Sequence, residues 1–360
     1  MVTLGERVVH YLILERITVY AEAMIVTLTG AFKNAGDYLI GDRARKLVRA
    51  HVDAEVIDIN RKEITDSHYE TFNKARAVLL TGGPAYQKMM YPKIYDLDVA
   101  RIEVPIIPFG LGWKGHLGQT PQEFEFSTPA TQFIQHIHSD KSHYSSARDF
   151  LTLEVLKKHG VENVAMTGCP AWYDEAMIDQ DYEFSNEVKT LVFSMPAAPN
   201  NQVKDVIAGL AKRFSRAKKY LTFQAGYRST NAQREAEITK WFRSSMFTGF
   251  RYGFRPVSFE SDFGKFTEVM SQSDFHIGYR VHSHIFSLSQ RKSSILIAED
   301  SRGIGQTQAM GGEALKSSDS SASILSKVDD LFDSKGQAVE QSISTMRKTY
   351  PTMLDFLGQI

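Results

Sequence analysis

The sequence predicts an α/β protein made of two Rossmann-like doubly wound domains. The chain has 360 residues, which is enough for two domains of ordinary size. Short apolar runs rich in β-branched residues alternate with segments of helical periodicity, a pattern typical of parallel βαβ units. The alternation occurs in two series, and the acidic, polar segment 177–188 between them is the predicted linker.

The first series opens with a strand at 24–31, a loop at 32–37 and a helix at 38–51. Two of the later strands end in glycine-rich loops. Ligands of open parallel sheets gather outside the carboxyl ends of the strands, so these loops are well placed for a binding site. The remaining strands are expected at 54–60, 76–86, 102–115, 143–149 and 162–174, and the helices at 125–140 and 150–160.

The second series repeats the alternation and ends in a pair of amphipathic helices from Ile324. Two such domains that face a cleft describe the GT-B-like architecture, but also periplasmic binding proteins and several dehydrogenases, so the fold alone does not identify the function. Its strands are expected at 189–197, 219–226, 254–259, 274–280 and 293–300, and its helices at 200–217, 231–245, 262–273 and 281–290. The expected division is an N-terminal extension at 1–23, domains at 24–180 and 181–335, and a helix at 336–360 that packs back across both domains.

The composition excludes several classes of protein. Lys and Arg number 42, as do Asp and Glu, so the chain has no overall positive charge for nucleic acid. The single cysteine, Cys169, cannot form an intramolecular disulfide and is interpreted as a packing residue. Glu15, Arg16 and Glu22 interrupt the apolar N-terminal stretches, and no secretory signal is recognisable. We therefore expect a cytoplasmic protein with at most peripheral membrane association.

Common cofactor motifs are absent from the sequence. No Gly-x-Gly-x-x-Gly follows the first strand and no Walker loop occurs, which disfavours dinucleotide and P-loop functions. His136 and His138 point to different helix faces, and His282 and His284 have no carboxylate nearby in a recognised metal-binding pattern. We expect neither a catalytic metal nor a bound cofactor.

The segment 274–300 contains the strongest candidates for chemistry. Arg280 and His282 lie where a strand ends and a helix begins, so free backbone N–H groups and a helix dipole lie beside a guanidinium. Such a site suits a phosphate or a carboxylate. The structural alternative is that Arg280 forms an ion pair and that His282 caps the helix or lies in the core.

The loops of the first domain supply candidates for substrate binding. Asn34, Gly36 and Asp37 follow the first strand, where glycine admits close approach and the polar side chains cap the helix or hold a sugar hydroxyl. Capping alone is the favoured role for Asp37. Gly82 and Gly83 also admit a ligand, but they fit a tight turn equally well.

Three further residues follow later strands of this domain. Trp113 is expected to be exposed and to stack on a sugar face, and His116 is a second candidate beside it. Arg148 precedes Asp149 at a strand end, where it either serves the site or forms a buried structural pair with Asp149.

Together these segments resemble the polysaccharide pyruvyl transferase family. The resemblance rests on Asn34-x-Gly36-Asp37, on Ser145-Ser146-Ala147-Arg148-Asp149 with the downstream Gly168-Cys169-Pro170-Ala171, and on Gly278-Tyr279-Arg280-Val281-His282. The last segment resembles the Arg-Leu-His of the family, with Val281 in place of Leu. The Gly82-Gly83-Pro84 loop and the extension at 1–23 depart from the family pattern and affect the expected acceptor rather than the reaction.

The resemblance implies a GT-B-like fold and transfer of the pyruvyl group of phosphoenolpyruvate to a sugar, giving a cyclic ketal and phosphate. Arg280 and Arg148 are then the ligands of the phosphate and carboxylate, and His282 is the general acid. The resemblance leaves open whether the glycan acceptor is free, lipid-linked or polymeric. It also leaves open whether the protein forms a homo-oligomer. The expected acceptor ligands are Asn34, Asp37, Trp113 and His116. The full set of expected substrate-binding residues is Asn34, Gly36, Asp37, Gly82, Gly83, Trp113, His116 and His284.

Two alternatives stay open. The first is a nucleotide-sugar-dependent glycosyltransferase of GT-B architecture, in which Glu299 and Asp300 bind ribose and glycine loops bind the diphosphate. The loops would come from Gly303, Gly305, Gly311 and Gly312. The second alternative is a non-catalytic two-domain protein that closes on a sugar.

Overall fold

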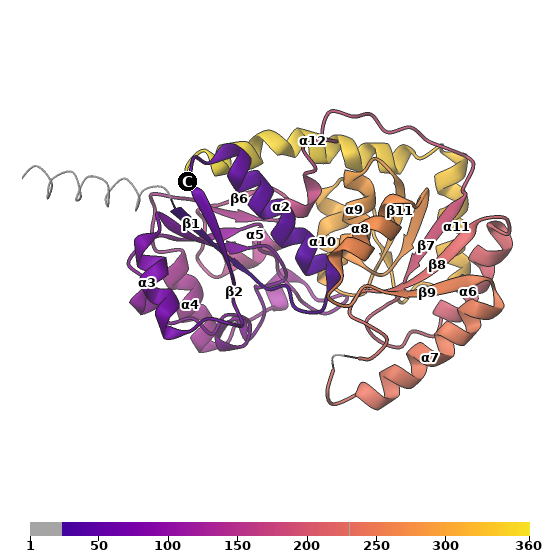
Figure 1. Ribbon diagram of the computed structural model, residues 1–360, viewed down its shortest axis with the longest axis horizontal. Coiled ribbons are helices and arrows are strands. Elements are labelled where there is room, and N and C mark those ends of the chain that lie inside the picture. Colours follow the sequence, from indigo (N-terminus) through magenta and orange to yellow (C-terminus); the bar gives the residue numbers. More distant parts are fainter. Residues whose placement is uncertain (1–23, 230) are drawn as a thin grey trace, which may run out of the picture.

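The computed structural model describes residues 24–229 and 231–360 and contains two α/β units that lie side by side (Figure 1). The larger sheets of both units are entirely parallel. Two Rossmann-like doubly wound domains, the predicted fold class, are therefore confirmed. The expected extension at 1–23 lies outside the described residues.

The first sheet has the strand order β2-β1-β3-β4. The order changes direction between β1 and β3, so the loops after these two strands flank a switch point, where ligands of such folds bind. A bridge between Leu111 and Ala147 joins a two-stranded sheet, β5-β6, to this domain. The elements are β1 (Met24–Thr29), α2 (Ala35–His51), β2 (Glu55–Asn60), α3 (Asp66–Lys74), β3 (Ala77–Thr81), β4 (Ile106–Phe109), α4 (Thr128–Ile137), β5 (Ser145–Ala147), α5 (Phe150–Lys158) and β6 (Val164–Met166), with short helical turns η1 (Met90–Ile94), η2 (Val99–Arg101), η3 (Pro121–Glu123) and η4 (Pro170–Trp172).

The second sheet has the order β12-β11-β10-β7-β8-β9. Its switch point lies between the neighbouring strands β7 and β10, and the chain after β10 carries Arg280 and His282. The elements are β7 (Thr190–Ser194), α6 (Val203–Arg213), β8 (Lys218–Phe223), α7 (Glu235–Arg251), β9 (Phe254–Ser258), α8 (Phe263–Ser271), β10 (Phe275–Gly278), α9 (Val281–Ser289), β11 (Ser293–Ala298), α10 (Ser301–Ala309), β12 (Leu315–Lys316), α11 (Ser321–Asp333) and α12 (Gln337–Leu357).

Some predicted boundaries were wrong. Helix α7 continues to Arg251, beyond its expected end at residue 245, because its buried stripe extends to Gly249. The strands expected at 143–149 and 162–174 shrink to the short β5 and β6, which pair with each other. The sequence also missed β12, a short edge strand in which Leu315 pairs with Ile297.

Helix α12 contacts both domains (Figure 1). Near its start, Val339 is buried beside α11 and β11 of the second domain. Near its end, the Phe356 ring packs against Phe109 of β4 with ring centroids 5.2 Å apart. Among residues 24–229 and 231–360, no helix has the length and hydropathy needed to cross a membrane.

Candidate active site

The candidate site is a cleft between the start of α2 and the carboxyl ends of strands in the second sheet. A cavity of about 290 Å³ lies there, and a narrower polar cavity adjoins it. Asn34 and Arg280 line both. The larger cavity is also lined by Lys33, Asp37, Gly226, Arg228 and Ser229, and the narrower one by Gly36, Gln224, Tyr279, His282, Glu299 and Arg302.

Helix α2 approaches α9 closely at Gly36. A Cβ atom on Gly36 would lie 2.8 Å from Cβ and Nδ1 of His282, so only glycine fits here without displacement. The Nε2 atom of His282 is buried and has no hydrogen-bond partner within the described part of the chain. Burial, together with the positive charges of Arg148 and Arg302, lowers the pKa of His282 to about 3. The imidazole is therefore neutral at pH 7.

Arg280 is held by backbone and side-chain contacts to the end of β7. Its backbone N–H donates to Ser194 Oγ over 3.2 Å, and its Nε donates to the carbonyl of Met195 over 2.7 Å. Arg280 is the N-cap residue of α9 and lines the narrower cavity together with Val281 and His282 of the first turn of that helix. The free N–H groups of this turn and the guanidinium therefore belong to one cavity wall, which suits an anion.

Asp37 belongs to the cleft and does not cap α2. Asn34 takes the capping role, because its side chain accepts a hydrogen bond of 3.0 Å from the backbone N–H of Gly36. The capping interpretation of Asp37 was therefore wrong. Desolvation raises the pKa of Asp37 to about 6, against the opposing effect of nearby positive charges. Those charges belong to Arg61, Arg302, Arg148 and Arg280.

Arg148 reaches the same region from the first domain. It is buried, its Nε lies 3.4 Å from Asp149 Oδ2, and its Nη2 donates to the carbonyl of Trp113 over 3.3 Å. Gly112 makes room for it, since a Cβ there would overlap the Arg148 side chain. The buried pair with Asp149 and the proximity to His282 occur together, so the two predicted roles do not exclude each other.

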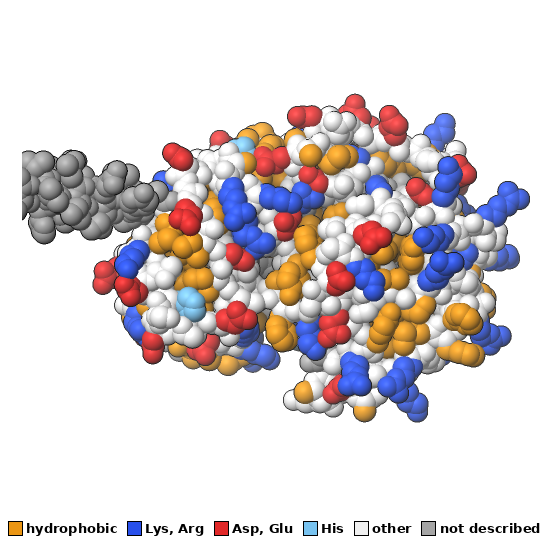
Figure 2. Space-filling view, in the orientation of Figure 1, with side chains coloured by type: hydrophobic (Ala, Val, Ile, Leu, Met, Phe, Trp, Pro, Cys, Tyr) orange, Lys and Arg blue, Asp and Glu red, His pale blue; other side chains and the backbone are white. Residues whose placement is uncertain are grey.

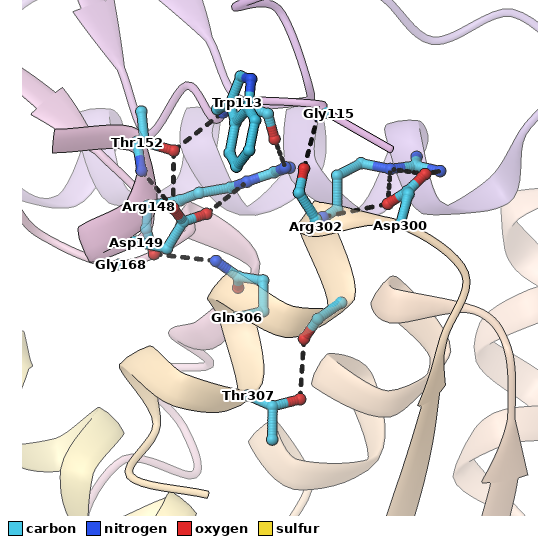
Figure 3. Close-up of polar contacts among 12 residues, drawn as sticks. Trp113, Gly115, Arg148, Asp149, Thr152, Gly168, Asp300, Arg302, Gln306 and Thr307 are labelled. Carbon is cyan, nitrogen blue, oxygen red and sulfur yellow. Dashed lines mark hydrogen bonds and ion pairs between the residues drawn. The ribbon is translucent and has the colours of Figure 1, made fainter. Parts of the chain in front are cut away.

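Helix α10 connects the two domains beside Arg148 (Figure 3). Gln306 donates from Nε2 to the carbonyl of Arg148 over 2.9 Å, and the Ser301 hydroxyl accepts from the N–H of Gly115 over 2.6 Å. Gly305 faces Asp149 so closely that a Cβ would lie 2.9 Å from its carboxyl carbon. Gly303 and Gly305 lie inside this helix, and so do not form the diphosphate loop of the glycosyltransferase alternative.

Three further residues of the cleft region, Arg302, Arg61 and Gln224, were not predicted from the sequence. Arg302 lies in the first turn of α10, and its Nε and Nη2 donate to both oxygens of Asp300 at 2.6 to 3.0 Å. The signal was the same as for Arg280, because each arginine lies at the turn from a parallel strand into a helix. Arg61 follows β2, where the sequence carries no comparable pattern.

Several predicted residues lie elsewhere. Trp113 is 1% exposed and packs edge-on against Phe124, so the expectation of an exposed stacking surface was wrong. His116 lines a separate cavity of about 460 Å³ with Lys114 and Gln119. Gly82 has a positive φ of 55°, and a Cβ there would overlap Ile40. Backbone conformation and packing therefore explain why this position is a glycine.

Backbone conformation explains Gly83, and packing explains Cys169. Gly83 has a positive φ of 80° and open space where a Cβ would lie, so its backbone conformation explains it. Cys169 is fully buried, and burial raises the pKa of its thiol to about 11. The thiol is therefore protonated at neutral pH, which confirms its interpretation as a packing residue.

His284 lies in a buried hydrogen-bonded chain behind the cleft. Its Nδ1 is 2.7 Å from Ser294 Oγ, which is 2.8 Å from Nδ1 of His276. Nε2 of His276 is 2.9 Å from Ser194 Oγ, the atom that accepts the Arg280 N–H. Burial lowers the pKa of both histidines, so both are neutral. His284 lines a cavity with α11 and α12, not the cleft.

The fold and the cleft between its two parallel sheets define a protein of the GT-B-like class. A model of the polysaccharide pyruvyl transferase family matches residues 34–301, which include the cleft residues from Asn34 to Glu299. The chain belongs to this family, as the three sequence segments predicted. A comparison with curated proteins gave no match.

Solved structures with the same fold come from several bacteria. MnaA of S. aureus, in complex with UDP, is 12% identical, with 89% of this chain and 91% of that chain covered and a TM-score of 0.54. The UDP-GlcNAc 2-epimerase of Neisseria meningitidis, bound to UDP-GlcNAc, is 10% identical over 92% and 100% of the chains, with a TM-score of 0.55. Anabaena Alr3699/HepE, in complex with UDP and glucose, is 10% identical over 94% and 100%, with a TM-score of 0.52. These similarities concern the fold.

Proposed function

We propose that the protein transfers the pyruvyl group of phosphoenolpyruvate to two hydroxyls of a glycan sugar, forming a cyclic ketal and releasing phosphate. The strongest support is the positive charge of the cleft. Guanidinium groups from both domains lie close enough to Asp37 and His282 to lower the pKa of each side chain. Phosphoenolpyruvate carries a phosphate and a carboxylate, and arginine binds both in bidentate fashion.

The donor is proposed to bind between Arg280 and Arg302. Both arginines lie at the start of a helix, α9 or α10, where the helix dipole adds to their positive charge. Arg302 is held by Asp300, so its orientation is fixed before the donor arrives. A rigid cation that stabilises charge developing on the departing phosphate contributes several kcal/mol in comparable sites, about 3 to 4.

His282 is the proposed acid for the methylene carbon of the donor. Because its pKa is about 3, His282 is neutral at pH 7 without an anion beside it. The negative charges of the donor favour the protonated imidazole, because an opposite charge close by raises the pKa of a histidine. Binding of the donor would thus favour the protonated form of His282 that the reaction needs.

The proposed steps balance in atoms and charge. The methylene carbon gains a proton from His282, and a sugar hydroxyl forms a C–O bond to the neighbouring carbon while Asp37 accepts its proton. The bond from that carbon to the phosphate oxygen then breaks, and the second hydroxyl closes the ketal. Of the two hydroxyl protons, one replaces the proton that His282 gave to the new methyl group. The other leaves with the phosphate.

The acceptor sugar is proposed to occupy the cavity of about 290 Å³ beside Asp37. Lys33, Arg228 and Ser229 line it and offer hydrogen bonds to hydroxyls. The glucose and UDP-sugar named for the Anabaena and Neisseria structures support a sugar in a cleft of this architecture. Trp113 and His116 have no part in this version of the acceptor site.

The test uses the purified full chain with phosphoenolpyruvate and a panel of galactosides, glucosides and mannosides. We expect sugar-dependent phosphate release and a product mass that gains one pyruvyl ketal. His282→Ala should abolish both, whereas His116→Ala, outside the cleft, should leave them unchanged. No release with any sugar, together with thermal stabilisation by UDP but not by phosphoenolpyruvate, would favour the glycosyltransferase alternative.

A further inference from the structure

Helix α7 presents an unusual face to solvent. Its buried residues are Ile238, Phe242, Ser245 and Gly249, as expected for one stripe of an amphipathic helix. The opposite stripe should be polar, but it carries Phe247 and Phe250, whose side chains are 65% and 74% exposed. Arg243 lies on the same stripe, because residues three and four positions apart share a helix face.

The exposed surface continues past the end of the helix. Arg251 is the last residue of α7 and Tyr252 follows it, and Arg255 is exposed on β9, an edge strand of the second sheet. We call these residues the α7 patch, which comprises Arg243, Phe247, Phe250, Arg251, Tyr252 and Arg255. Figure 2 shows hydrophobic and basic side chains side by side over α7 at the lower edge of the second domain.

The charge of this region is one-sided, although the whole chain has a net charge of zero. No Asp or Glu occurs between Ile238 and Phe259. Exposed aromatic residues interspersed with arginines, without carboxylates, match the interface of an anionic bilayer, where rings enter the headgroup layer and cations meet phosphates. A single exposed aromatic residue would need no explanation, but a contiguous group with one sign of charge does.

We propose that the α7 patch binds the surface of a membrane that contains anionic phospholipids. The loop before α7 lines the cleft with Gly226, Arg228 and Ser229, whereas the α7 patch begins on the C-terminal half of the same helix. A bilayer at the patch would therefore lie on the same helix as the cleft but toward its far end, and a lipid-linked glycan would have to extend along α7 to reach the cleft. The membrane contact itself does not depend on the proposed pyruvyl transfer.

The test is co-sedimentation of the full chain with vesicles of phosphatidylcholine alone and of phosphatidylcholine mixed with phosphatidylglycerol. We expect binding to the anionic vesicles only, weakening as NaCl is raised. Phe247→Ser with Phe250→Ser, and separately Arg243→Gln with Arg251→Gln, should each lower the apparent affinity about tenfold or more. Phe150→Ser is the matched control, because Phe150 is 51% exposed on α5 of the other domain.

Three results would overturn the proposal. The first is that the wild type ignores anionic vesicles. The second is that both double variants bind like the wild type, which would assign the binding to another part of the chain. The third is a concentration-dependent dimer, seen by gel filtration, that the double variant Phe247→Ser with Phe250→Ser no longer forms. That result would show that a second copy of the chain, not a membrane, covers the α7 patch. The substituted residues are exposed, so thermal unfolding should be unchanged and serves as the folding control.

Discussion

The Nε2 atom of His276 lies 2.9 Å from the hydroxyl oxygen of Ser194 in the core of the second domain. Ser194 Oγ also accepts the backbone N–H of Arg280. Because that oxygen accepts one hydrogen bond, its own proton is free to be donated to His276. The arginine most central to the proposed donor site is therefore positioned by groups that lie entirely behind it.

Ser194→Ala should weaken donor binding. The change removes the acceptor of the Arg280 N–H and the partner of His276 Nε2, while His276 Nδ1 keeps its contact with Ser294. The expected cost is about 1–3 kcal/mol in the free energy of unfolding. We expect KM for phosphoenolpyruvate to rise roughly tenfold with a smaller change in kcat, since a shift of about 1.4 kcal/mol in binding is tenfold. Ser273→Ala removes another buried hydroxyl of this domain and should lower stability without moving KM.

Gly36→Ala should lower the proposed activity strongly without unfolding the protein. Alanine favours a helix over glycine by about 0.5–1 kcal/mol, but its Cβ would lie 2.8 Å from His282. The imidazole or the start of α2 must then shift, and activity should fall more than about tenfold. Gly264→Ala in α8, where a Cβ would meet only Asp262 Oδ1 at 3.7 Å, is the control with full activity. Wild-type kinetics in Gly36→Ala would show that His282 does not act from this position.

Asp37→Asn should alter the dependence of stability on pH. The folded pKa of about 6 lies above the ordinary value of 3.8, so the folded state binds the proton more tightly. The wild type therefore loses stability as pH rises from about 4 to 6, and the loss persists above pH 6. At pH 8 the variant should be more stable by about 1–2 kcal/mol, a figure reduced from the full linkage value because the cleft is partly open to solvent.

The same substitution tests the proposed base. Wild-type kcat/KM should rise with pH through about 6 as Asp37 ionises, and Asp37→Asn should remove this limb along with most of the activity. Chemical denaturation and initial rates measured across pH 4 to 8 give both profiles. A variant that keeps the rising limb would assign that ionisation to another group.

Arg302→Lys should impair donor binding although the charge is kept. Lysine cannot reproduce the two-pronged contact with Asp300, so the cation loses its fixed direction. We expect KM for phosphoenolpyruvate to increase about tenfold or more. Arg234→Lys is the matched control, since Arg234 makes the same paired contact with Glu237 on the exposed surface of the second domain. Equal kinetics in the two variants would remove Arg302 from the donor site.

Much of the fold followed from local patterns, and so did the principal site residues. Arg280 and His282 were found because a turn from a parallel strand into a helix has a clear sequence signature. Arg302 carries the same signature one unit later, after β11, and could have been found in the same way. The assignment of Asp37 failed because two polar residues near the start of α2 compete for one capping position, which Asn34 occupies.

Other residues depend on contacts that the sequence does not reveal. The burial of Trp113 requires Phe124 to pack against it and the Arg148 side chain to bond to its carbonyl. The sequence could not predict whether the His284 side chain faces the cleft. Helix α9 is buried from Ser283 to Ser289, so it has no exposed polar face from which the direction of His284 could be inferred. Arg61 joins the other arginines only through the pairing of β2 with β1.

Helix α12 carries Pro351 in its interior, between Val339, which is buried against the second domain, and Phe356, whose ring contacts Phe109 and Tyr144 of the first. Proline supplies no N–H to the carbonyl four residues earlier, so the helix is easiest to bend there. Contacts with the first domain already include Tyr350, which packs against Tyr173 directly before the proline. We therefore expect a rotation that widens or narrows the cleft to bend α12 near Pro351.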